Sequence, residues 1–454
     1  MNTSVKDRKI SETANKQLII GAGFVGLGVA QGFKQANILY DQVDASDEIG
    51  GNWYHGVYET AHIISSKRIT QFSNFPMPES YPDFPSAQEM RDYINAFADR
   101  FELRENIELN RKVTYVRPIE DNLWEVSFAN GEQRIYKGIL MCNGHHWSKR
   151  FPEFEGEFSG EIIHSKDYKK PEQLKGKKVL VIGGGNSACD IAAEAARVGS
   201  KCVLSMRDSV WFIPKIFQGT PIADLGKDKK GTSPLWYQRL MTYLVIRFTF
   251  GTHESYGLPK PKHKIFEKHP TINNEVPYYI KHGRIIAKPG VAKLDDRSVE
   301  FVDGTREEVE LIVCATGYYV SYPFLPPELQ RVRGSVVECY GDCFLDDYRG
   351  LYFVGWYQPR GGIGSIVSAF APLLAKYIKL QEEINVPIGL VLKEMGEKIR
   401  KTHLIGSDEI FTSIDRAMSN FDKIVEKADR VNAKYPNFKN KPLATQKEPE
   451  KILL

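Results

Sequence analysis

Two glycine-rich stretches are the residues of this sequence whose types and spacing most clearly imply chemistry. The first fits G-x-G-x-x-G, the second fits G-x-G-x-x-A, and each stands between a short apolar strand and a helix. Glycines here let the backbone approach a pyrophosphate, and the following helix offers free N–H groups and the positive end of its dipole. We therefore predict two dinucleotide-binding loops rather than two incidental turns. Their residues are Gly21, Gly23 and Gly26 in the first loop, and Gly183, Gly185, Asn186, Ser187 and Ala188 in the second.

The residues that end the next strand distinguish the two dinucleotides. After the first loop, a predicted strand at 38–40 is followed by Asp41 and Asp44, and either carboxylate suits a ribose 2′-hydroxyl. After the second loop, a predicted strand at 201–205 leads to Ser205 and Arg207 without an acid. A hydroxyl and a guanidinium suit a 2′-phosphate, although an arginine by itself is also typical of a solvated surface. We predict NADPH at the second loop, and FAD, which accepts its hydride, at the first.

Composition narrows the remaining classes. The 454 residues carry 61 Lys and Arg against 57 Asp and Glu, with 42% hydrophobic residues and a mean hydropathy of −0.36. These values exclude a disordered chain, a polytopic membrane protein and a dedicated nucleic-acid binder. The six cysteines are scattered without a C-x-x-C pair, so we expect buried thiols, a cytoplasmic setting and no disulfide-reductase activity. No metal-ligand cluster and no nucleophile triad is evident.

The elements that position the two loops predict an α/β fold with two Rossmann-like dinucleotide-binding domains. The NADPH domain is expected inside a split FAD domain, because each loop has its own strand and helix. The expected borders are 1–165 and 306–430 for the FAD domain, 166–305 for the NADPH domain, and 431–454 for a loosely ordered extension. A helical insert is expected around 213–277. Its apolar helix at 235–250 is expected to be buried or interfacial, with core packing favoured over membrane contact, and is too short to span a bilayer.

Further motifs resemble the flavin-containing monooxygenases over about residues 17–380. Phe158 to Tyr168 fits that family's F-x-G-x-x-x-H-x-x-x-Y signature without a mismatch, and Gly50-Gly51-Asn52-Trp53 fits its G-G-x-W. The family's ribose-binding acid stands six residues before G-G-x-W, which favours Asp44 over Asp41. The resemblance implies that the signature links the two domains. The other residues expected at the FAD site are Gly51, Trp53, Gln71, Gly317, Gln358 and Gly362.

The resemblance also implies the reaction. NADPH reduces FAD, the reduced flavin forms a C4a-hydroperoxide with O2, and this oxygenates a soft nitrogen or sulfur of a small molecule. The family's active-site asparagine falls here on Ile64, which cannot donate a hydrogen bond. Ser65 or Ser66 is then the candidate replacement; otherwise the loop register differs or the peroxide is less protected. From this gap we predict faster uncoupled NADPH oxidation than is usual in the family.

Arg360 leaves a second mechanism open. It precedes the glycine loop expected at the flavin, where a cation could stabilise an anionic peroxyflavin for Baeyer–Villiger oxygenation of ketones. A phosphate or surface contact is the simpler interpretation. The same scaffold also fits an uncoupled NADPH oxidase or a catalytically silent flavoprotein module. We expect no nucleic-acid partner, no transmembrane anchor and a homo-oligomer, and we leave peripheral membrane contact open.

Overall fold

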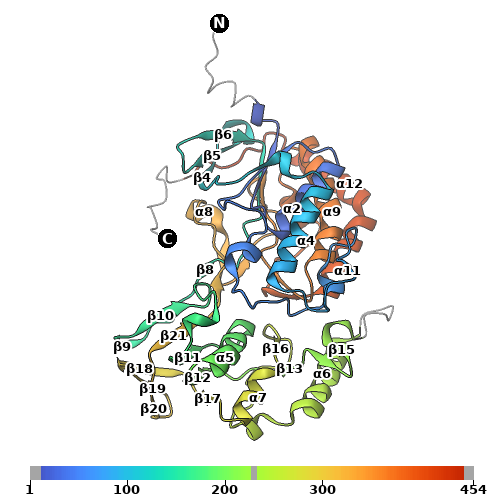
Figure 1. Ribbon diagram of the computed structural model, residues 1–454. Coiled ribbons are helices and arrows are strands. Elements are labelled where there is room, and N and C mark those ends of the chain that lie inside the picture. Colours follow the sequence, from blue (N-terminus) through green and yellow to red (C-terminus); the bar gives the residue numbers. More distant parts are fainter. Residues whose placement is uncertain (1–11, 226–232, 444–454) are drawn as a thin grey trace.

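Two five-stranded parallel sheets organise the computed structural model, which describes residues 12–225 and 233–443 (Figure 1). The first sheet has the order β25-β7-β1-β2-β3, with bounds Leu351–Phe353, Gly138–Met141, Gln17–Ile20, Tyr40–Val43 and Ile107–Glu108. The second has the order β10-β21-β11-β12-β17, with bounds Glu161–His164, Leu311–Cys314, Lys178–Ile182, Lys201–Ser205 and Ile285–Lys288. Helices cover both sheets, so the predicted α/β fold with two dinucleotide-binding domains is confirmed.

The chain leaves the first sheet after β7, builds the second sheet from β10 to β21, and returns in β25. Strand pairing moves both expected borders of this insertion. β10, expected before residue 166 in the FAD domain, and β21, expected after residue 305 in the same domain, both belong to the second sheet, where Ile163 lies opposite Val313. β7 and β21 are both apolar strands that run toward a glycine. Their sequence pattern is the same, so only the long-range pairing separates them.

The first domain carries the upper helices of Figure 1. α2 (Phe24–Gln35) and α9 (Gly364–Glu383) cross closely, because a Cβ at Gly28 would collide with Val367 and one at Gly32 with Ala371. Its other helices are α3 (Lys67–Thr70), α4 (Ala87–Arg100), α8 (Pro327–Gln330), α10 (Ile388–Glu394), α11 (Ser407–Ser419) and α12 (Phe421–Lys434). An antiparallel sheet of β4 (Val113–Pro118), β5 (Trp124–Phe128) and β6 (Gln133–Tyr136) lies beside them.

The core of this domain fixes α3 and the loop before it. The ring of Phe72 stacks between Phe24 and Phe97, with centroid distances of 4.3 and 3.9 Å. The Tyr93 hydroxyl accepts from the Phe72 N–H at 2.8 Å and donates to the Phe75 carbonyl at 2.5 Å. Because the rings at the centre of this stack are buried, the end of α3 is held firmly beside the first dinucleotide loop.

The second domain contains α5 (Asn186–Val198), α6 (Leu235–Phe250) and α7 (Glu275–Lys281). A four-stranded sheet covers its outer side, with β9 (Glu155–Phe158), β18 (Val291–Asp296), β19 (Ser298–Phe301) and β20 (Arg306–Glu308). Five two-stranded pairs make up the remaining strands of the described residues. Two lie in the insert: β13 (Phe212–Ile213) with β16 (Thr271–Ile272), and β14 (Ile216–Phe217) with β15 (Thr220–Pro221). The others are β8 (Ser148–Lys149) with β22 (Tyr318–Tyr319), β23 (Val332–Arg333) with β24 (Val336–Val337), and β26 (Gln358–Arg360) with β27 (Leu404–Gly406).

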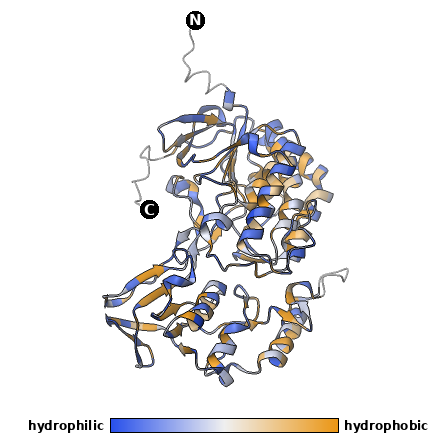
Figure 2. Cartoon of the chain, viewed as in Figure 1, coloured by the Kyte–Doolittle hydropathy of each residue, from blue (hydrophilic) through white to orange (hydrophobic). Residues whose placement is uncertain are grey.

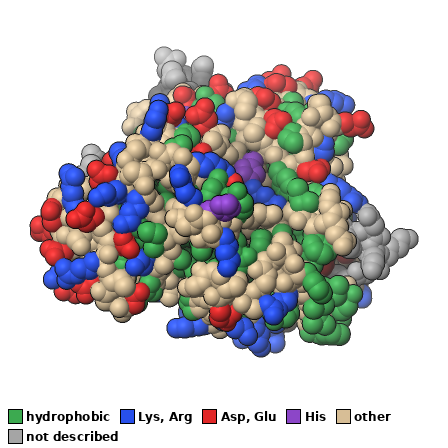
Figure 3. Space-filling model, turned by 60° about the horizontal axis from the view of Figure 1, so that its bottom comes forward, with side chains coloured by type: hydrophobic (Ala, Val, Ile, Leu, Met, Phe, Trp, Pro, Cys, Tyr) green, Lys and Arg blue, Asp and Glu red, His purple; other side chains and the backbone are tan. Residues whose placement is uncertain are grey.

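For the apolar helix 235–250, the core packing that was favoured is wrong, whereas the interfacial position stays a prediction. α6 stands at the edge of the lower lobe, and of its sixteen residues only Ile246 is buried (Figure 2). Trp236 is 66% exposed and Phe248 is 81% exposed, and hydrophobic side chains gather at one edge of the face in Figure 3. Apolar residues occur on all sides of this helix, so it has no distinct polar face from which exposure to solvent could be predicted. None of the helices within the described ranges is long and apolar enough to cross a membrane.

Two local expectations also differ from the structure. The second strand of the first domain runs over Tyr40–Val43 rather than 38–40, because Asn37 turns the chain with a positive φ of 54°. The extension expected from residue 431 begins inside α12, where Val431 is buried, and the Asn440 N–H donates to Asn122 Oδ1 at 2.7 Å. Residues 444–454 of that extension lie outside the described residues. The expectation that the six thiols are buried is confirmed.

Candidate functional site

The first glycine loop is built for a phosphate. α2 begins after Gly23 with no side-chain cap and no acid in its first turn, so its first N–H groups remain available. A Cβ at Gly26 would collide with the Gly21 carbonyl, so the turn excludes side chains there. Gly51 crosses close above it, because a Cβ on that residue would stand 3.0 Å from the Gly23 Cα. Two backbone segments without side chains therefore face each other at the helix N-terminus.

Asp44 is the acid that reaches this loop. It directly follows β2, and its Oδ2 accepts from the Ala22 N–H at 2.7 Å. Asp41 lies within β2, and its carboxylate already accepts from Lys16 Nζ at 2.8 Å and from the Tyr136 hydroxyl at 3.1 Å. The geometry thus supports Asp44 as the ribose acid. Asn143, at the end of β7 beside Gly21, has a buried Oδ1 with no hydrogen-bond partner among the described residues, which fits a group supplied from outside the protein.

The second glycine loop repeats this arrangement. α5 begins after Gly185, again with no side-chain cap and no acid in the first turn. A Cβ on Gly185 would have nothing within 4 Å, so this backbone faces open space. Gly183 cannot carry a side chain, because its φ is +141° and a Cβ would collide with the Ala315 carbonyl. The exposed Arg207 follows β12, and the structure gives its guanidinium no acceptor within the described part of the chain.

Three of the expected NADP residues have structural partners instead. Ser205 is 1% exposed and donates its hydroxyl to the Pro289 carbonyl at 2.7 Å, so it has no free donor for a phosphate. Asn186 accepts from the Ile272 N–H at 2.8 Å and donates to the Pro270 carbonyl at 3.0 Å, and Ala188 is fully buried. These contacts fix the loop from within. The prediction of a direct phosphate contact by Ser205 is therefore corrected, because the last residue of β12 points into the protein.

The remaining FAD candidates line the edge of the first domain around α3. Gln71 Oε1 accepts from the Met77 N–H at 2.9 Å. Gly362 has no room for a Cβ against the Ile69 carbonyl, so the glycine loop after β26 rests directly on α3. Trp53 lies in a short π-helix, Asn52–Gly56, and Gln358 begins β26. Gly317, with φ +84°, ends the β21 segment, and its carbonyl is 3.0 Å from His164 Nε2 of the signature. This contact holds His164 against the neighbouring strand of the second sheet, and the link between the two domains that the resemblance implied stays a prediction.

The candidate catalytic residues come directly before α3. Ile63 is buried, Ile64 is half-buried, and the Ser65 hydroxyl lies 2.7 Å from the Thr70 hydroxyl. Ser66 donates to Asp224 Oδ1 at 2.5 Å, so its hydroxyl joins the two domains. Arg360, at the end of β26, turns toward the insert and stacks over the Phe266 ring with 5.1 Å between Cζ and the ring centroid. Both serine hydroxyls are therefore already engaged within the protein.

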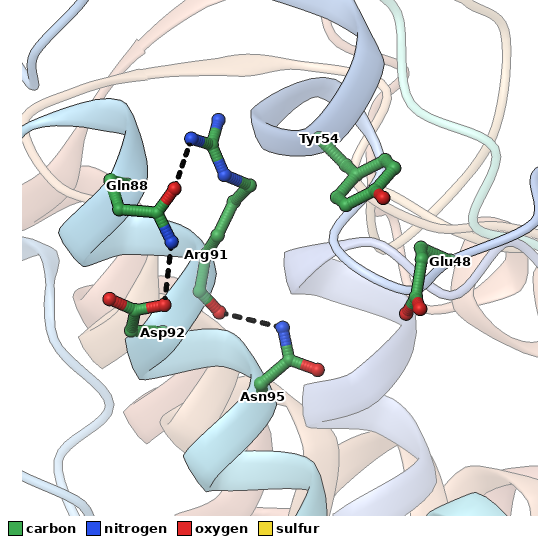
Figure 4. A pocket seen from close by; sticks show the side chains of 6 residues that line it. All are labelled: Glu48, Tyr54, Gln88, Arg91, Asp92 and Asn95. Carbon is green, nitrogen blue, oxygen red and sulfur yellow. Dashed lines mark hydrogen bonds between the residues drawn. The ribbon is translucent and has the colours of Figure 1, made fainter.

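A separate polar hollow lies between the π-helix Asn52–Gly56 and α4 and is shown in Figure 4. Its α4 side chains bond to one another: Gln88 donates to Asp92 at 2.8 Å, and Arg91 donates to Gln88 at 2.5 Å. Because these polar groups satisfy each other and none is an expected cofactor residue, the hollow is not assigned to the site.

Comparison with known proteins identifies the family of this chain. A sequence model described as flavin-binding monooxygenase-like matches residues 14–440. The chain belongs to the flavin-binding monooxygenase-like family. Flavin-containing monooxygenase 3 of Rattus norvegicus is 31% identical over 445 residues, with 88% of this chain and 82% of that protein covered. Dimethylaniline monooxygenase [N-oxide-forming] 2 of Macaca mulatta is 31% identical over 380 residues, with 77% and 70% covered.

A solved structure agrees at the level of the fold. The ε-caprolactone-bound crystal structure of cyclohexanone monooxygenase has a TM-score of 0.66 at 19% identity, with 81% of this chain and 88% of that chain covered. The predicted family, fold and cofactors are confirmed: this flavin monooxygenase uses FAD and NADPH. The uncapped helix N-termini, Asp44 and Arg207 are the features of its own chain that fit these two groups.

Sequence reasoning missed the contacts that bring the two cofactor loops together. The Tyr58 hydroxyl donates to Asp190 at 2.8 Å, and the Thr60 hydroxyl donates to Glu194 at 2.9 Å, so the segment before Ile64 lies along α5. His62 and Lys215 are also in contact. No periodicity or motif predicts these pairs, because the two residues of each pair are more than 130 positions apart in the sequence.

A second missed feature is a histidine cluster at the boundary between the two domains, which we call the seam. Its members, drawn from three separate parts of the chain, are His145, His146, His269 and His403. The rings of His145 and His146 are 4.2 Å apart, and those of His145 and His403 are 5.0 Å apart. Burial lowers the pKa of His146 and of His269 to about 4, and the neighbouring imidazoles act in the same direction on both. The cluster is therefore neutral at pH 7.

We predict that this cluster makes the protein acid-sensitive. Unfolded histidines take up protons near pH 6.5, whereas folded His146 and His269 do so only near pH 4. The unfolded chain binds more protons between these values, so the free energy of unfolding falls as pH falls through that window. The melting temperature should therefore decrease from pH 7 to pH 5, and less steeply in the double variant His146→Gln, His269→Gln. The exposed His55 and His282, changed to Gln together, are the control. An unchanged slope in the first variant would contradict the assignment.

Proposed function

We propose that this enzyme transfers one oxygen atom from O2 to a soft nitrogen or sulfur of a small molecule, at the expense of NADPH. The observation that carries the proposal is the pair of uncapped, glycine-lined helix N-termini, one in each parallel sheet, joined by the segment before Ile64. The N-oxide-forming activity in the name of the macaque relative supports nitrogen as one target atom.

Bound flavin, once reduced by NADPH, supplies the activated oxygen, so the protein needs few reactive side chains. Its residues bind and orient the cofactors. We assign the first-turn N–H groups of α2 and Asp44 to the FAD pyrophosphate and ribose, and those of α5 and Arg207 to NADPH. Gly51, Trp53, Gln71, Gly317, Gln358 and Gly362 remain the proposed walls of the FAD site.

The segment from Tyr58 to Ser66 couples the two binding sites. It is tied to α5 through Asp190 and Glu194, and to the insert through Asp224. It leads directly into α3, against which the glycine loop Gly361–Gly364 rests. Order at the NADPH site is therefore transmitted to the edge of the FAD site, and the apolar Ile63 and Ile64 help to exclude water from it.

Three rival activities would make different products. Baeyer–Villiger oxygenation of a ketone is the second candidate, favoured by a cation, Arg360, next to the flavin-side glycine loop. An NADPH oxidase would release only hydrogen peroxide, and a silent flavoprotein module would not consume NADPH.

The test is NADPH consumption with a trial amine, a thioether and a ketone, with peroxide release measured alongside. We expect purified protein to be yellow, to bleach with NADPH and to regain colour in air. We expect the amine or the thioether to gain one oxygen atom. Exclusive ester formation from the ketone would replace the proposal with Baeyer–Villiger chemistry, and a spectrum unresponsive to NADPH would establish the silent module.

Ile64 generates a separate prediction. Since isoleucine cannot donate a hydrogen bond, we expect a large share of the NADPH oxidised by the wild type to end as hydrogen peroxide. Ile64→Asn should lower the peroxide released per NADPH by roughly 3- to 10-fold, the scale of one hydrogen bond. Ile64→Leu, which also donates no hydrogen bond, is the matched control. Tight coupling in the wild type, seen as product equal to NADPH consumed, would contradict this prediction.

We also propose that the protein is a cytoplasmic homo-oligomer assembled through α6. Six free, buried thiols support a reducing compartment, and the exposed Trp236 and Phe248 support an additional partner surface. Peripheral membrane contact through the same helix is the competing interpretation.

Assembly through α6 is testable by light scattering coupled to size exclusion. Changing Trp236 and Phe248 together to Glu should convert the oligomer to a monomer, because charges replace the apolar contact. Val302→Glu, at a 68% exposed apolar position in the turn after β19 and away from α6, is the control and should leave the mass unchanged. A monomeric wild type that co-sediments with lipid vesicles would support membrane contact instead.

A further inference from the structure

The guanidinium of Arg360 is a half-buried cation with no hydrogen-bonded anion in the described part of the chain. Arg360 ends β26, beside β27, and its head group packs against Gly406 so closely that a Cβ there would touch it. Phe266 of the insert covers one face of the guanidinium. Within residues 12–225 and 233–443, no carboxylate or carbonyl accepts a hydrogen bond from it. Its N–H edge is therefore left without a protein acceptor, while its face is covered.

Other arginines of comparable burial are treated differently by this fold. Arg134 donates to Glu132 at 2.8 Å and also pairs with Glu108, and Arg331 pairs with Asp347. Arg400 donates to Asp342 at 2.8 Å and takes Glu409 as a second partner. Because removal of a cation from water is costly without a partner, an unpaired guanidinium in this position indicates an anion supplied by a ligand. Burial correspondingly lowers the pKa of Arg360.

The position of Arg360 connects it to the chemistry. The two residues after it, Gly361 and Gly362, rest on Ile69 of α3, and α3 begins immediately after the Ile64–Ser66 segment. The insert reaches this same edge twice, through Asp224 on Ser66 and through Phe266 on Arg360. The guanidinium therefore lies where the insert meets the expected flavin edge. The cofactor phosphates have their own sites at the N-termini of α2 and α5.

We propose that Arg360 and Phe266 form a subsite for a carboxylate carried by the substrate. The proposal rests on the proposed function and narrows its substrate class to soft nucleophiles with an acidic group. Phe266 fixes the plane of the guanidinium by stacking, and the free edge offers parallel N–H donors that match the two oxygens of a carboxylate. The nearby Asp408 and Glu409 weaken the positive potential, but Glu409 already pairs with Arg400.

The experiment compares two thioethers that differ only in charge, para-methylthiobenzoate and methyl para-tolyl sulfide. Wild type should have the higher kcat/KM for the carboxylate. Arg360→Met should lower that value by roughly 10- to 100-fold, mainly through KM, with less than about a twofold change for the neutral thioether. Arg360→Lys should restore part of the loss, because it keeps the charge without the fork. Arg430→Met, at an exposed arginine on α12, is the matched control and should change neither value.

Three outcomes overturn the subsite. Equal loss for both thioethers means that Arg360 acts on the flavin, and no loss for either means that it is a surface residue. The third outcome is measured by calorimetric titration of para-methylthiobenzoate into the FAD-loaded protein, an experiment that needs no turnover. There, equal dissociation constants for wild type and Arg360→Met would overturn the subsite. If neither thioether is oxygenated while the titration still shows a roughly 10- to 100-fold weaker Arg360→Met, the proposed function fails and the subsite stands. Unchanged melting temperature and FAD content confirm that the variants fold.

Discussion

The constraint on which this structure depends is the close approach of bare backbone to an anion at a helix N-terminus. α2 and α5 both begin without a side-chain cap and without a first-turn acid, which leaves N–H groups that the protein itself does not satisfy. Glycines keep that space open, since side chains at Gly26 or Gly183 would strike neighbouring carbonyls. Each parallel sheet holds one such terminus in place, and in our proposal the cofactors complete the hydrogen bonding there.

Hydrogen bonds between the two domains connect the two proposed cofactor sites. Tyr58, Thr60 and Ser66 donate to Asp190, Glu194 and Asp224, so the segment before α3 is held by the second domain. The insert then covers the same edge, with Phe266 over Arg360. In our proposal these contacts orient the cofactors and exclude water from the site. Ile64 and Arg360 both lie next to these contacts, which is why we propose that they affect coupling and specificity.

Local patterns predict the cofactor loops well and the pairing of strands less well. The glycine motifs and the choice of Asp44 need only short-range spacing, and the structure places the Asp44 carboxylate at the first glycine loop, where it accepts from the Ala22 N–H. The prediction for Ser205 is wrong, because the direction of a side chain at a strand end depends on the neighbouring β17 segment and the Pro289 carbonyl. The prediction for α6 is also wrong, since an apolar helix looks the same in sequence whether a neighbour covers it or not.

The sequence by itself determined the fold class, the two dinucleotides and the insertion of one domain in the other, because glycine turns and apolar strands are local signals. Only the tertiary structure decided which sheet β10 and β21 join, since strand pairing links residues far apart in the chain. It also decided that four histidines from three parts of the chain meet at the seam, and that Arg360 faces Phe266 with its N–H edge free. These features arise from long-range packing, in which burial and partner identity are set together.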